Sequence, residues 1–173
     1  MTDAFEIRPA IVEDVPLILS FIKQLAEYEK LLHEVVATED ILKETLFGKH
    51  AHAEVIIGYL NQEPISFALY FHNFSTFLGL PGIYLEDLFV KPSVRGKGIG
   101  QKMLSYLAHL AKHRKCGRLE WWVLDWNETA IAFYKRIGAK TMDEWTVYRV
   151  ADQALDNLAA KWEGNNTAIR ELN

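Results

Sequence analysis

The chain has 173 residues, of which half are hydrophobic and 12% aromatic, so it can build one core and is excluded from the disordered class. Its formal net charge of −4 offers no general electrostatic reason to bind nucleic acid or an anionic membrane. Cys116 is the only cysteine, which rules out an intrachain disulfide and fits a reducing compartment.

Targeting and membrane segments are not apparent in the sequence. The N-terminus lacks a basic segment followed by a long apolar core, and no apolar run reaches the ~18 residues of a membrane span. We therefore expect a cytoplasmic protein that binds neither membranes nor nucleic acid.

The N-terminal part predicts a strand followed by two helices. Phe5–Arg8 alternates like a short strand. Asp14 is predicted to cap a helix that runs to about Leu31, and Thr38 a shorter helix that ends at Gly48.

The middle of the chain reads as β structure. Glu54–Leu60 and Ile65–Phe74 predict a hairpin around residues 61–64. Leu-Pro-Gly at residues 80–82 is expected to break the chain before a strand over Ile83–Val90.

The remaining elements alternate between helix and strand. The expected elements are a helix over Gly98–Arg114, a strand over Arg118–Leu124, a helix from Asn127 or Glu128 to Gly138, a strand over Glu144–Val150 and a helix over Ala151–Trp162. This order predicts a mixed α/β (α+β) fold, with mostly antiparallel N-terminal strands followed by a βαβα unit. We expect a single domain over residues 1–162 and a flexible tail over residues 163–173.

A glycine-rich turn stands between the strand that ends at Val90 and the next helix. It reads Arg95-Gly96-Lys97-Gly98-Ile99-Gly100. A P-loop pattern is absent, and the third glycine of a dinucleotide fingerprint would fall at Gln101. Such a turn at a helix start leaves backbone N–H groups free to bind phosphate, and the alternative is an ordinary turn with solvated basic residues.

A second segment, Asn127 to Ala139, follows the next predicted strand. Its pattern Asn-x-x-Ala-x-x-Phe-Tyr-x-x-x-Gly-Ala, combined with Arg-x-x-Gly-x-Gly, resembles the GNAT family of acetyl-CoA-dependent N-acetyltransferases. The resemblance covers roughly Phe5 to Val150. Tyr-Leu-Glu-Asp at residues 84–87, Trp-Asn-Glu at 126–128 and Leu-Ala-Glu-Tyr-Glu at 25–29 look like the diamine and polyamine (spermidine/spermine) and thialysine acetyltransferase branch.

The resemblance implies acetyl-CoA as co-substrate. We expect no metal, because His109 and His113 have the spacing of a metal pair but lack the glutamate of HExxH. The strand residues would pair with the pantetheine arm, the turn would hold the pyrophosphate, and the Asn127 segment would contact the cofactor. The implied cofactor contacts are Leu88, Phe89, Val90, Arg95, Gly96, Lys97, Gly98, Ile99, Gly100, Gln101, Asn127, Glu128, Thr129, Ala130 and Tyr134.

The same resemblance implies where the amine binds. The residues implied are Tyr28, Glu29, Glu86, Asp87, Glu120, Trp121 and Trp122. Each of these residues also has an alternative explanation without function: the acids can be solvated surface charges, and the aromatic residues can be core side chains. Because neighbouring strand residues point to opposite faces, we expect at most one of Glu86 and Asp87 to aim directly into the site, and we select Glu86.

The chemistry assigns catalytic roles to Glu86 and Tyr134. A primary amine with a pKa near ~10 must lose a proton before it attacks a thioester, and Glu86 would remove it directly or through water. Tyr134 carries a phenolic O–H that would protonate the departing thiolate. Without the resemblance, Tyr134 reads as a core aromatic residue.

The sequence also bears on the choice of substrate and on the oligomeric state. The polyamine branch uses an acidic residue where Ser75 stands, so we expect a short diamine or a lysine-like amine rather than spermine. The alternatives are a non-catalytic acyl-CoA-binding sensor module and a protein or peptide N-acetyltransferase. By resemblance alone, we expect a homodimer.

Overall fold

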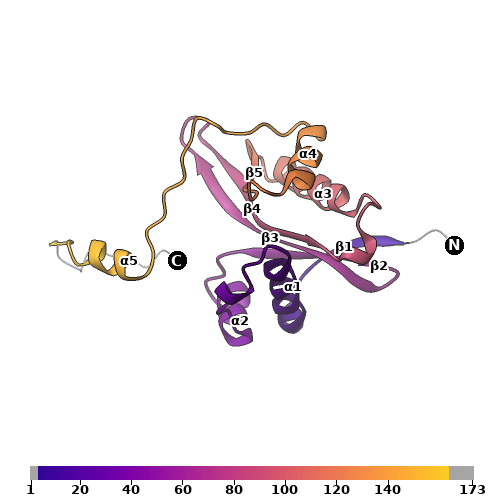
Figure 1. The fold of residues 1–173 in the computed structure, drawn as a ribbon, viewed down its shortest axis with the longest axis horizontal. Coiled ribbons are helices and arrows are strands. Elements are labelled where there is room, and N and C mark those ends of the chain that lie inside the picture. Colours follow the sequence, from indigo (N-terminus) through magenta and orange to yellow (C-terminus); the bar gives the residue numbers. More distant parts are fainter. Residues whose placement is uncertain (1–3, 164–173) are drawn as a thin grey trace. The chain divides into compact units, whose positions relative to one another are not determined.

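The computed structural model describes residues 4–163, and the chain divides into two compact units at Trp122 and Val123. The first unit holds a five-stranded sheet and three α-helices, and the second holds helices α4 and α5 (Figure 1). The single domain predicted over residues 1–162 stays a prediction. The predicted tail lies outside the described residues, apart from Glu163.

The sheet of the first unit has the strand order β1-β2-β3-β4-β5. Strands β1 to β4 pair antiparallel in sequence order, and β5 pairs parallel to β4 after the crossover helix α3. This arrangement confirms the mixed α/β prediction. The strands are β1 (Phe5–Pro9), β2 (Glu54–Leu60), β3 (Glu63–Ser75), β4 (Leu80–Val90) and β5 (Leu119–Trp121).

Helices cover both faces of this sheet. Helices α1 (Val15–Tyr28) and α2 (Glu39–Phe47) lie on one face, where the rings of Phe21 and Phe67 stack at 5.4 Å between centroids. Helix α3 (Ile99–His113) lies on the other face (Figure 1). Its buried side chains follow helical spacing, as the sequence predicts.

The predicted caps are met in part. Thr38 Oγ1 accepts a hydrogen bond from the backbone N–H of Ile41 at 3.2 Å, so it caps α2 as predicted. Asp14 stands at the N-cap position of α1, but its carboxylate accepts from the N–H of Ile11 and holds the preceding 3₁₀ turn instead. Helix α1 ends at Tyr28 rather than Leu31, because Lys30 adopts a φ of +63° that no α-helix continues.

The β3–β4 connection is a correction. The turn is made by residues 76–79, where Gly79 supplies a φ of +65°. Residues 80–82 therefore do not break the chain but extend β4, and Pro81 pairs with Phe74. A proline φ is compatible with an extended strand, and the turn residues had already reversed the chain.

The C-terminal strands are also corrected. Strand β5 covers Leu119–Trp121 rather than Arg118–Leu124, because its pairing with β4 ends at Trp121. Residues 144–150 form no strand in the described structure. Their alternating pattern specifies two faces, but a strand also needs a neighbour to accept its ladder hydrogen bonds.

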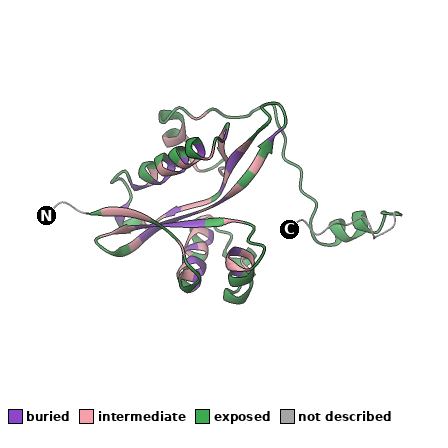
Figure 2. Ribbon diagram, turned by 180° about the vertical axis from the view of Figure 1, so that it is seen from behind, coloured by how far each residue is buried: buried purple, intermediate pink, exposed green. Residues whose placement is uncertain are grey.

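The second unit contains α4 (Glu128–Arg136) and α5 (Asp152–Ala159). Asn127 caps α4, since its Oδ1 accepts from the N–H of Ala130 at 3.3 Å, and Gly138 follows with a φ of +89°. Residues 140–163 are exposed throughout, as the green colour of α5 in Figure 2 shows.

Candidate active site

The glycine-rich turn places backbone donors at the start of α3. Gly96 and Gly98 have φ values of +79° and +76°, and a Cβ atom on either would meet nothing within 4 Å. These glycines are therefore required by backbone conformation and not by lack of space. Gly98 is the N-cap of α3 without a side-chain cap, so the first N–H groups of the helix are available to an anion.

Strand β4 presents an open edge that leads to this turn. Its pairing with β5 covers only Ile83–Leu85, whereas its pairing with β3 continues to Val90. From Glu86 onward, the β5 side of the strand has no strand partner among the described residues. The open edge, which includes Leu88–Val90, is the length of backbone that we expect an extended amide chain to pair with.

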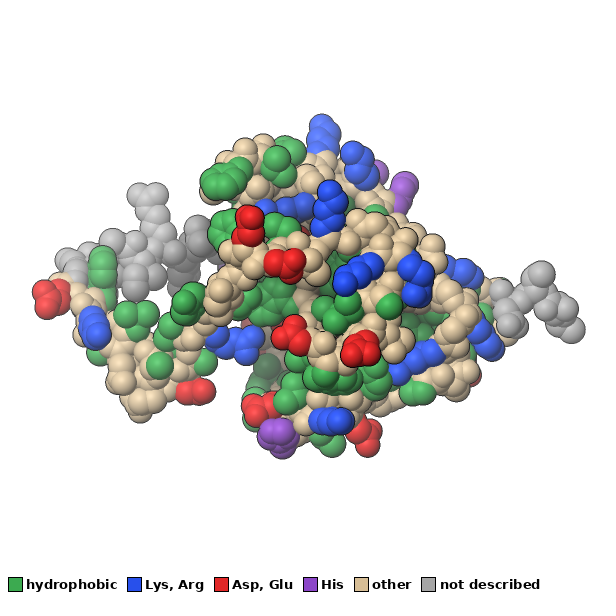
Figure 3. All heavy atoms as spheres, turned by 45° about the horizontal axis from the view of Figure 1, so that its top comes forward, with side chains coloured by type: hydrophobic (Ala, Val, Ile, Leu, Met, Phe, Trp, Pro, Cys, Tyr) green, Lys and Arg blue, Asp and Glu red, His purple; other side chains and the backbone are tan. Residues whose placement is uncertain are grey.

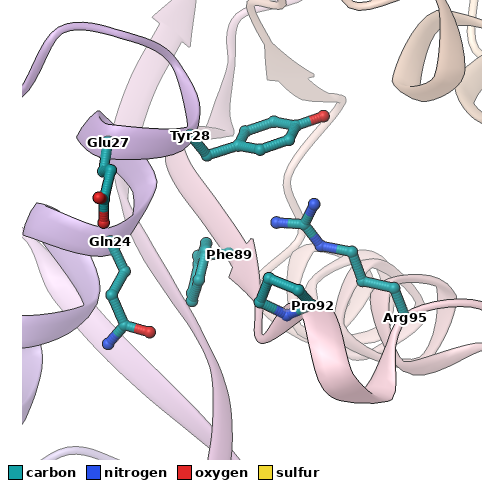
Figure 4. A pocket seen from close by; sticks show the side chains of 6 residues that line it. All are labelled: Gln24, Glu27, Tyr28, Phe89, Pro92 and Arg95. Carbon is teal, nitrogen blue, oxygen red and sulfur yellow. The ribbon is translucent and has the colours of Figure 1, made fainter.

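The Arg95 side chain lies on the α1 side of the turn. Its Nε donates to the carbonyl of Val90 at 2.9 Å, and its guanidinium carbon lies 4.4 Å from the ring centroid of Tyr28. Figure 4 shows this guanidinium aimed at Tyr28 across an open hollow. The hollow is lined by Gln24, Glu27, Tyr28, Phe89, Pro92 and Arg95. The turn is thus tied to the end of α1, where Tyr28 and Glu29 stand.

A β-bulge falls at the two candidate acids. Leu69 pairs with Asp87 and Tyr70 pairs with Leu85, so Glu86 is the extra residue of β4. The bulge interrupts the strict alternation that predicted opposite faces for Glu86 and Asp87. Glu86 is exposed and Asp87 is half-buried.

The environment makes Asp87 a weak acid. Burial raises the pKa of Asp87 to about 6, and the nearby charges of Glu86 and Glu29 add to the rise. Burial likewise raises the pKa of Glu29. A carboxyl group with a pKa close to neutral is suited to proton transfer at physiological pH.

The predicted amine-binding residues of β5 divide between the two faces of the sheet. Tyr84 pairs with Glu120 and Phe71, and the rings of Tyr84 and Trp122 meet edge to face at 5.7 Å. Trp121 pairs with Leu85 and, by alternation, lies on the opposite face from Glu120 and Trp122.

Two residues that the sequence did not single out join Glu120. The amide Nδ2 of Asn73 donates to Glu120 Oε2 at 2.7 Å, and Arg118 Nε lies 2.8 Å from the same oxygen. Asn73 belongs to β3, Arg118 directly precedes β5, and neither carries a motif, so only the pairing of β3, β4 and β5 reveals them. Ser75 is instead buried, and its hydroxyl accepts from the N–H of Leu78 within the turn.

The second unit carries the other predicted cofactor residues. Asn127 uses its side chain as the α4 cap described above, and Glu128, Thr129 and Ala130 form the first turn of α4. Tyr134 is half-buried, and its ring lies 5.4 Å from the ring of Phe133.

Within residues 4–163, no group of three or more His, Cys, Asp or Glu side chains is placed to hold a metal ion. No helix in this range combines the length and apolar character needed to cross a membrane. Acidic and basic side chains are interspersed on the face shown in Figure 3.

Comparison with known proteins adds independent evidence. A family model described as "Acetyltransferase (GNAT) family" matches residues 21–139. A thialysine N-epsilon-acetyltransferase of Bos taurus is 36% identical over 166 residues, covering 90% of this chain and 97% of that protein. The L-ornithine N5-acetyltransferase NATA1 of Arabidopsis thaliana is 31% identical, covering 86% of this chain and 85% of that protein.

A solved structure agrees with the fold. The integron cassette protein VCH_CASS6 from the mobile metagenome of V. cholerae has a TM-score of 0.76 and 31% identity. The match covers 90% of this chain and 97% of that one.

Proposed function

This chain belongs to the acetyltransferase (GNAT) family, and we propose that it moves an acetyl group from acetyl-CoA to a primary amine of a small diamine, polyamine or lysine-like substrate. The observation that carries this proposal is the open edge of β4, which runs directly into the glycine-rich start of α3. An extended amide chain ending in a pyrophosphate fits an unpaired strand edge followed by a cluster of helix N–H donors.

Two stretches of backbone would hold acetyl-CoA. Backbone groups of Leu88–Val90 would pair with the pantetheine arm, and those of Arg95–Gln101 would bind the pyrophosphate. We propose that Asn127–Ala130 and Tyr134 contact the cofactor as well. Bound acetyl-CoA supplies the activated acetyl group, and every other requirement of the reaction falls on the protein.

The proton of the ammonium group must leave before the amine attacks. We assign this step to the pair Glu86 and Asp87, acting directly or through water. Glu86 is exposed at the bulge, and Asp87, with its pKa raised to about 6, can take up a proton near neutral pH. A negatively charged pair also attracts the cationic substrate before the reaction.

The negative charges that develop on the acetyl oxygen and on the departing thiolate need hydrogen-bond or proton donors. A backbone N–H along Leu88–Val90 would stabilise negative charge on the acetyl oxygen. Tyr134 would give its phenolic proton to the departing thiolate. We propose direct attack without a covalent enzyme intermediate, since Cys116, the only cysteine, is buried just after the end of α3.

The relatives narrow the acceptor to small amines. The matched proteins are named for acetylation of thialysine and ornithine, both of which carry a primary amine at the end of a short chain. Tyr28, Glu29, Glu120 and Trp122 are proposed to line the path of that chain. Trp121, which was also predicted to bind the amine, is left out of this proposed lining because by alternation it lies on the other face of β5.

The test is thiol release from acetyl-CoA with putrescine, spermidine, spermine, lysine, thialysine and a lysine peptide, alongside direct binding of acetyl-CoA. Amine-dependent release supports the proposal. Binding without release for any amine would favour a sensor, and preference for the peptide a protein acetyltransferase. Absence of acetyl-CoA binding would overturn the cofactor assignment.

We further propose a homodimer that works in the cytoplasm without a metal. The exposed apolar side chains of residues 142–162, among them Trp145, Tyr148 and Trp162, support an additional contact surface. Sedimentation equilibrium tests the assembly, and a monomer at micromolar concentration would contradict it. The proposed cytoplasmic location is supported by the single cysteine, and the proposed lack of a metal by the missing HExxH motif.

A further inference from the structure

Side chains from three strands meet on the α1 face of the sheet, beyond the acid pair. Phe71, Tyr84 and Glu120 form one cross-strand row through the pairings of β3, β4 and β5. Asn73 lies two residues after Phe71, Gly82 two residues before Tyr84, and Arg118 two residues before Glu120. All three therefore share this face. We call Asn73, Arg118 and Glu120 the distal triad.

Gly82 allows the triad to assemble. A Cβ atom at Gly82 would lie 2.4 Å from Asn73 Oδ1 and 2.9 Å from Arg118 Cγ. Since real Cβ atoms do not approach other atoms so closely, the Asn73 and Arg118 side chains cross the strand where only a glycine leaves room. The gathering is therefore a built feature of the sheet.

The triad has polar capacity that the described residues do not use. Both recorded contacts of Glu120 fall on Oε2, one from Asn73 and one from Arg118. Oε1 of Glu120 and the two terminal nitrogens of Arg118 have no recorded partner among residues 4–163. Asn73 Oδ1 and Arg118 Nε are buried without a hydrogen bond, although Arg118 Nε is close enough to Glu120 for an ion pair.

An anion and a cation side by side, each with open positions, match a zwitterion. Arg118 offers donors in the fork geometry that carboxylates accept, and Glu120 offers an acceptor for an ammonium group. A diamine or polyamine, which has no carboxylate, offers no acceptor to the terminal nitrogens of Arg118. A basic α-amino acid satisfies both charges with its α-carboxylate and α-ammonium groups.

Aromatic rings line the route from the triad toward the acid pair. Tyr84 contacts Phe71 at 5.1 Å and Trp122 at 5.7 Å between ring centroids. The Cα positions of Tyr84, which pairs with Glu120, and Glu86 are two residues or ~7 Å apart along the strand. This is the distance that an extended lysine-type side chain spans between its α-carbon and terminal nitrogen.

We propose that the distal triad is a subsite for the zwitterionic head group of a basic α-amino acid, with Arg118 binding the α-carboxylate and Glu120 the α-ammonium. The inference rests on the proposed acetyl transfer and specifies its acceptor. The head group is anchored at β5, the aliphatic chain passes the aromatic wall, and the terminal amine reaches Glu86 and Asp87. The side-chain amine is acetylated and the α-amine is left unmodified.

Three acceptors that differ by one group test the subsite. Lysine carries both head-group charges, cadaverine lacks the carboxylate, and 6-aminohexanoate lacks the α-ammonium. The expected result is a kcat/KM for lysine that exceeds those of the other two by roughly tenfold or more, as for the loss of one charged hydrogen-bond pair. Mass spectrometry of the lysine product should place the acetyl group on the side-chain nitrogen.

Two substitutions assign the partners. Arg118→Gln should lower kcat/KM roughly tenfold for lysine and 6-aminohexanoate and leave cadaverine unchanged. Glu120→Gln should lower it for lysine and cadaverine and leave 6-aminohexanoate unchanged. Arg118→Lys retains the positive charge. It should therefore recover part of the lost kcat/KM for lysine and 6-aminohexanoate, the two substrates that carry a carboxylate.

The control is Arg8→Gln, which removes an exposed arginine on β1 and should leave the ranking of the three amines unchanged. Equal loss with all three amines in Arg118→Gln would reveal a merely structural role and overturn the proposal. Equal kcat/KM for lysine and cadaverine in the unchanged protein would also overturn it. If no amine is acetylated, the proposed function itself fails, and that outcome is distinct from both.

Discussion

The two ends of the proposed site are built by different means. At the cofactor end, the β4 edge and the start of α3 present backbone groups, and the key glycines have positive φ with empty space around them. At the amine end, side chains from three strands converge, and Gly82 serves by leaving room for them. A site made of backbone groups should be sensitive to substitutions that change the backbone conformation and insensitive to most side-chain changes. A site made of side chains should lose its function when those side chains are replaced.

The largest effect is expected at Gly98. Gly98→Val forces a β-branched residue into a φ of +76°, which distorts the turn and should abolish acetyl-CoA binding in calorimetry. Gly79→Val is the matched control, because Gly79 has a φ of +65° and equally open space but lies in the β3–β4 turn. Similar destabilisation of both variants with loss of binding only in Gly98→Val would sharpen the comparison, and retained binding would break it.

Tyr134→Phe asks whether a side chain also contributes at the cofactor end. The phenolic proton is lost while the ring remains, so kcat should fall roughly a hundredfold and the Kd of acetyl-CoA should change little. Steady-state kinetics with lysine and titration of acetyl-CoA separate the two quantities. Unchanged turnover would remove Tyr134 from the mechanism.

The raised pKa of Asp87 predicts how the stability of the protein depends on pH. Because folding raises its pKa to about 6, the folded chain binds the proton more tightly than the unfolded chain does. The stability from this group is thus full below about pH 4 and is lost as the pH rises through about 6. Asp87→Asn should flatten this dependence and stabilise the protein by about 3 kcal/mol at neutral pH.

Urea unfolding across this pH range measures the effect. Glu86→Gln is the informative companion, since it removes one of the charges that raise the pKa of Asp87 and should move the transition to lower pH. A stability profile of Asp87→Asn that follows the unchanged protein would contradict the assignment.

The smallest effect is expected from Gly82→Ala. The added methyl group must displace Asn73 and Arg118, so kcat/KM for lysine should fall about tenfold. The affinity for acetyl-CoA should stay within about twofold, because the cofactor end is built independently. An equal loss of acetyl-CoA affinity would show that the two ends are not separate.

Some local backbone signals predicted the structure correctly, whereas the Asp14 cap and the chain break at residues 80–82 were wrong. The Thr38 cap, the β2–β3 hairpin and the glycine-rich start of α3 each depend on residues close together in the chain. The β2–β3 turn proved tighter than predicted, because Asn61 and Gln62 both adopt positive φ. The predicted strand at residues 144–150 failed since its partner is not encoded locally.

The sequence by itself therefore determined the family, the mixed sheet and the glycine-rich turn before α3, because glycine spacing and hydrophobic periodicity are local properties of the chain. Only the tertiary structure decided which side chains share the amine end. The bulge at Glu86 changed the expected relation between the two acids, and strand pairing placed Asn73 beside Glu120 across 47 positions of sequence. Register and bulges depend on the partner strand, so no single segment reveals them.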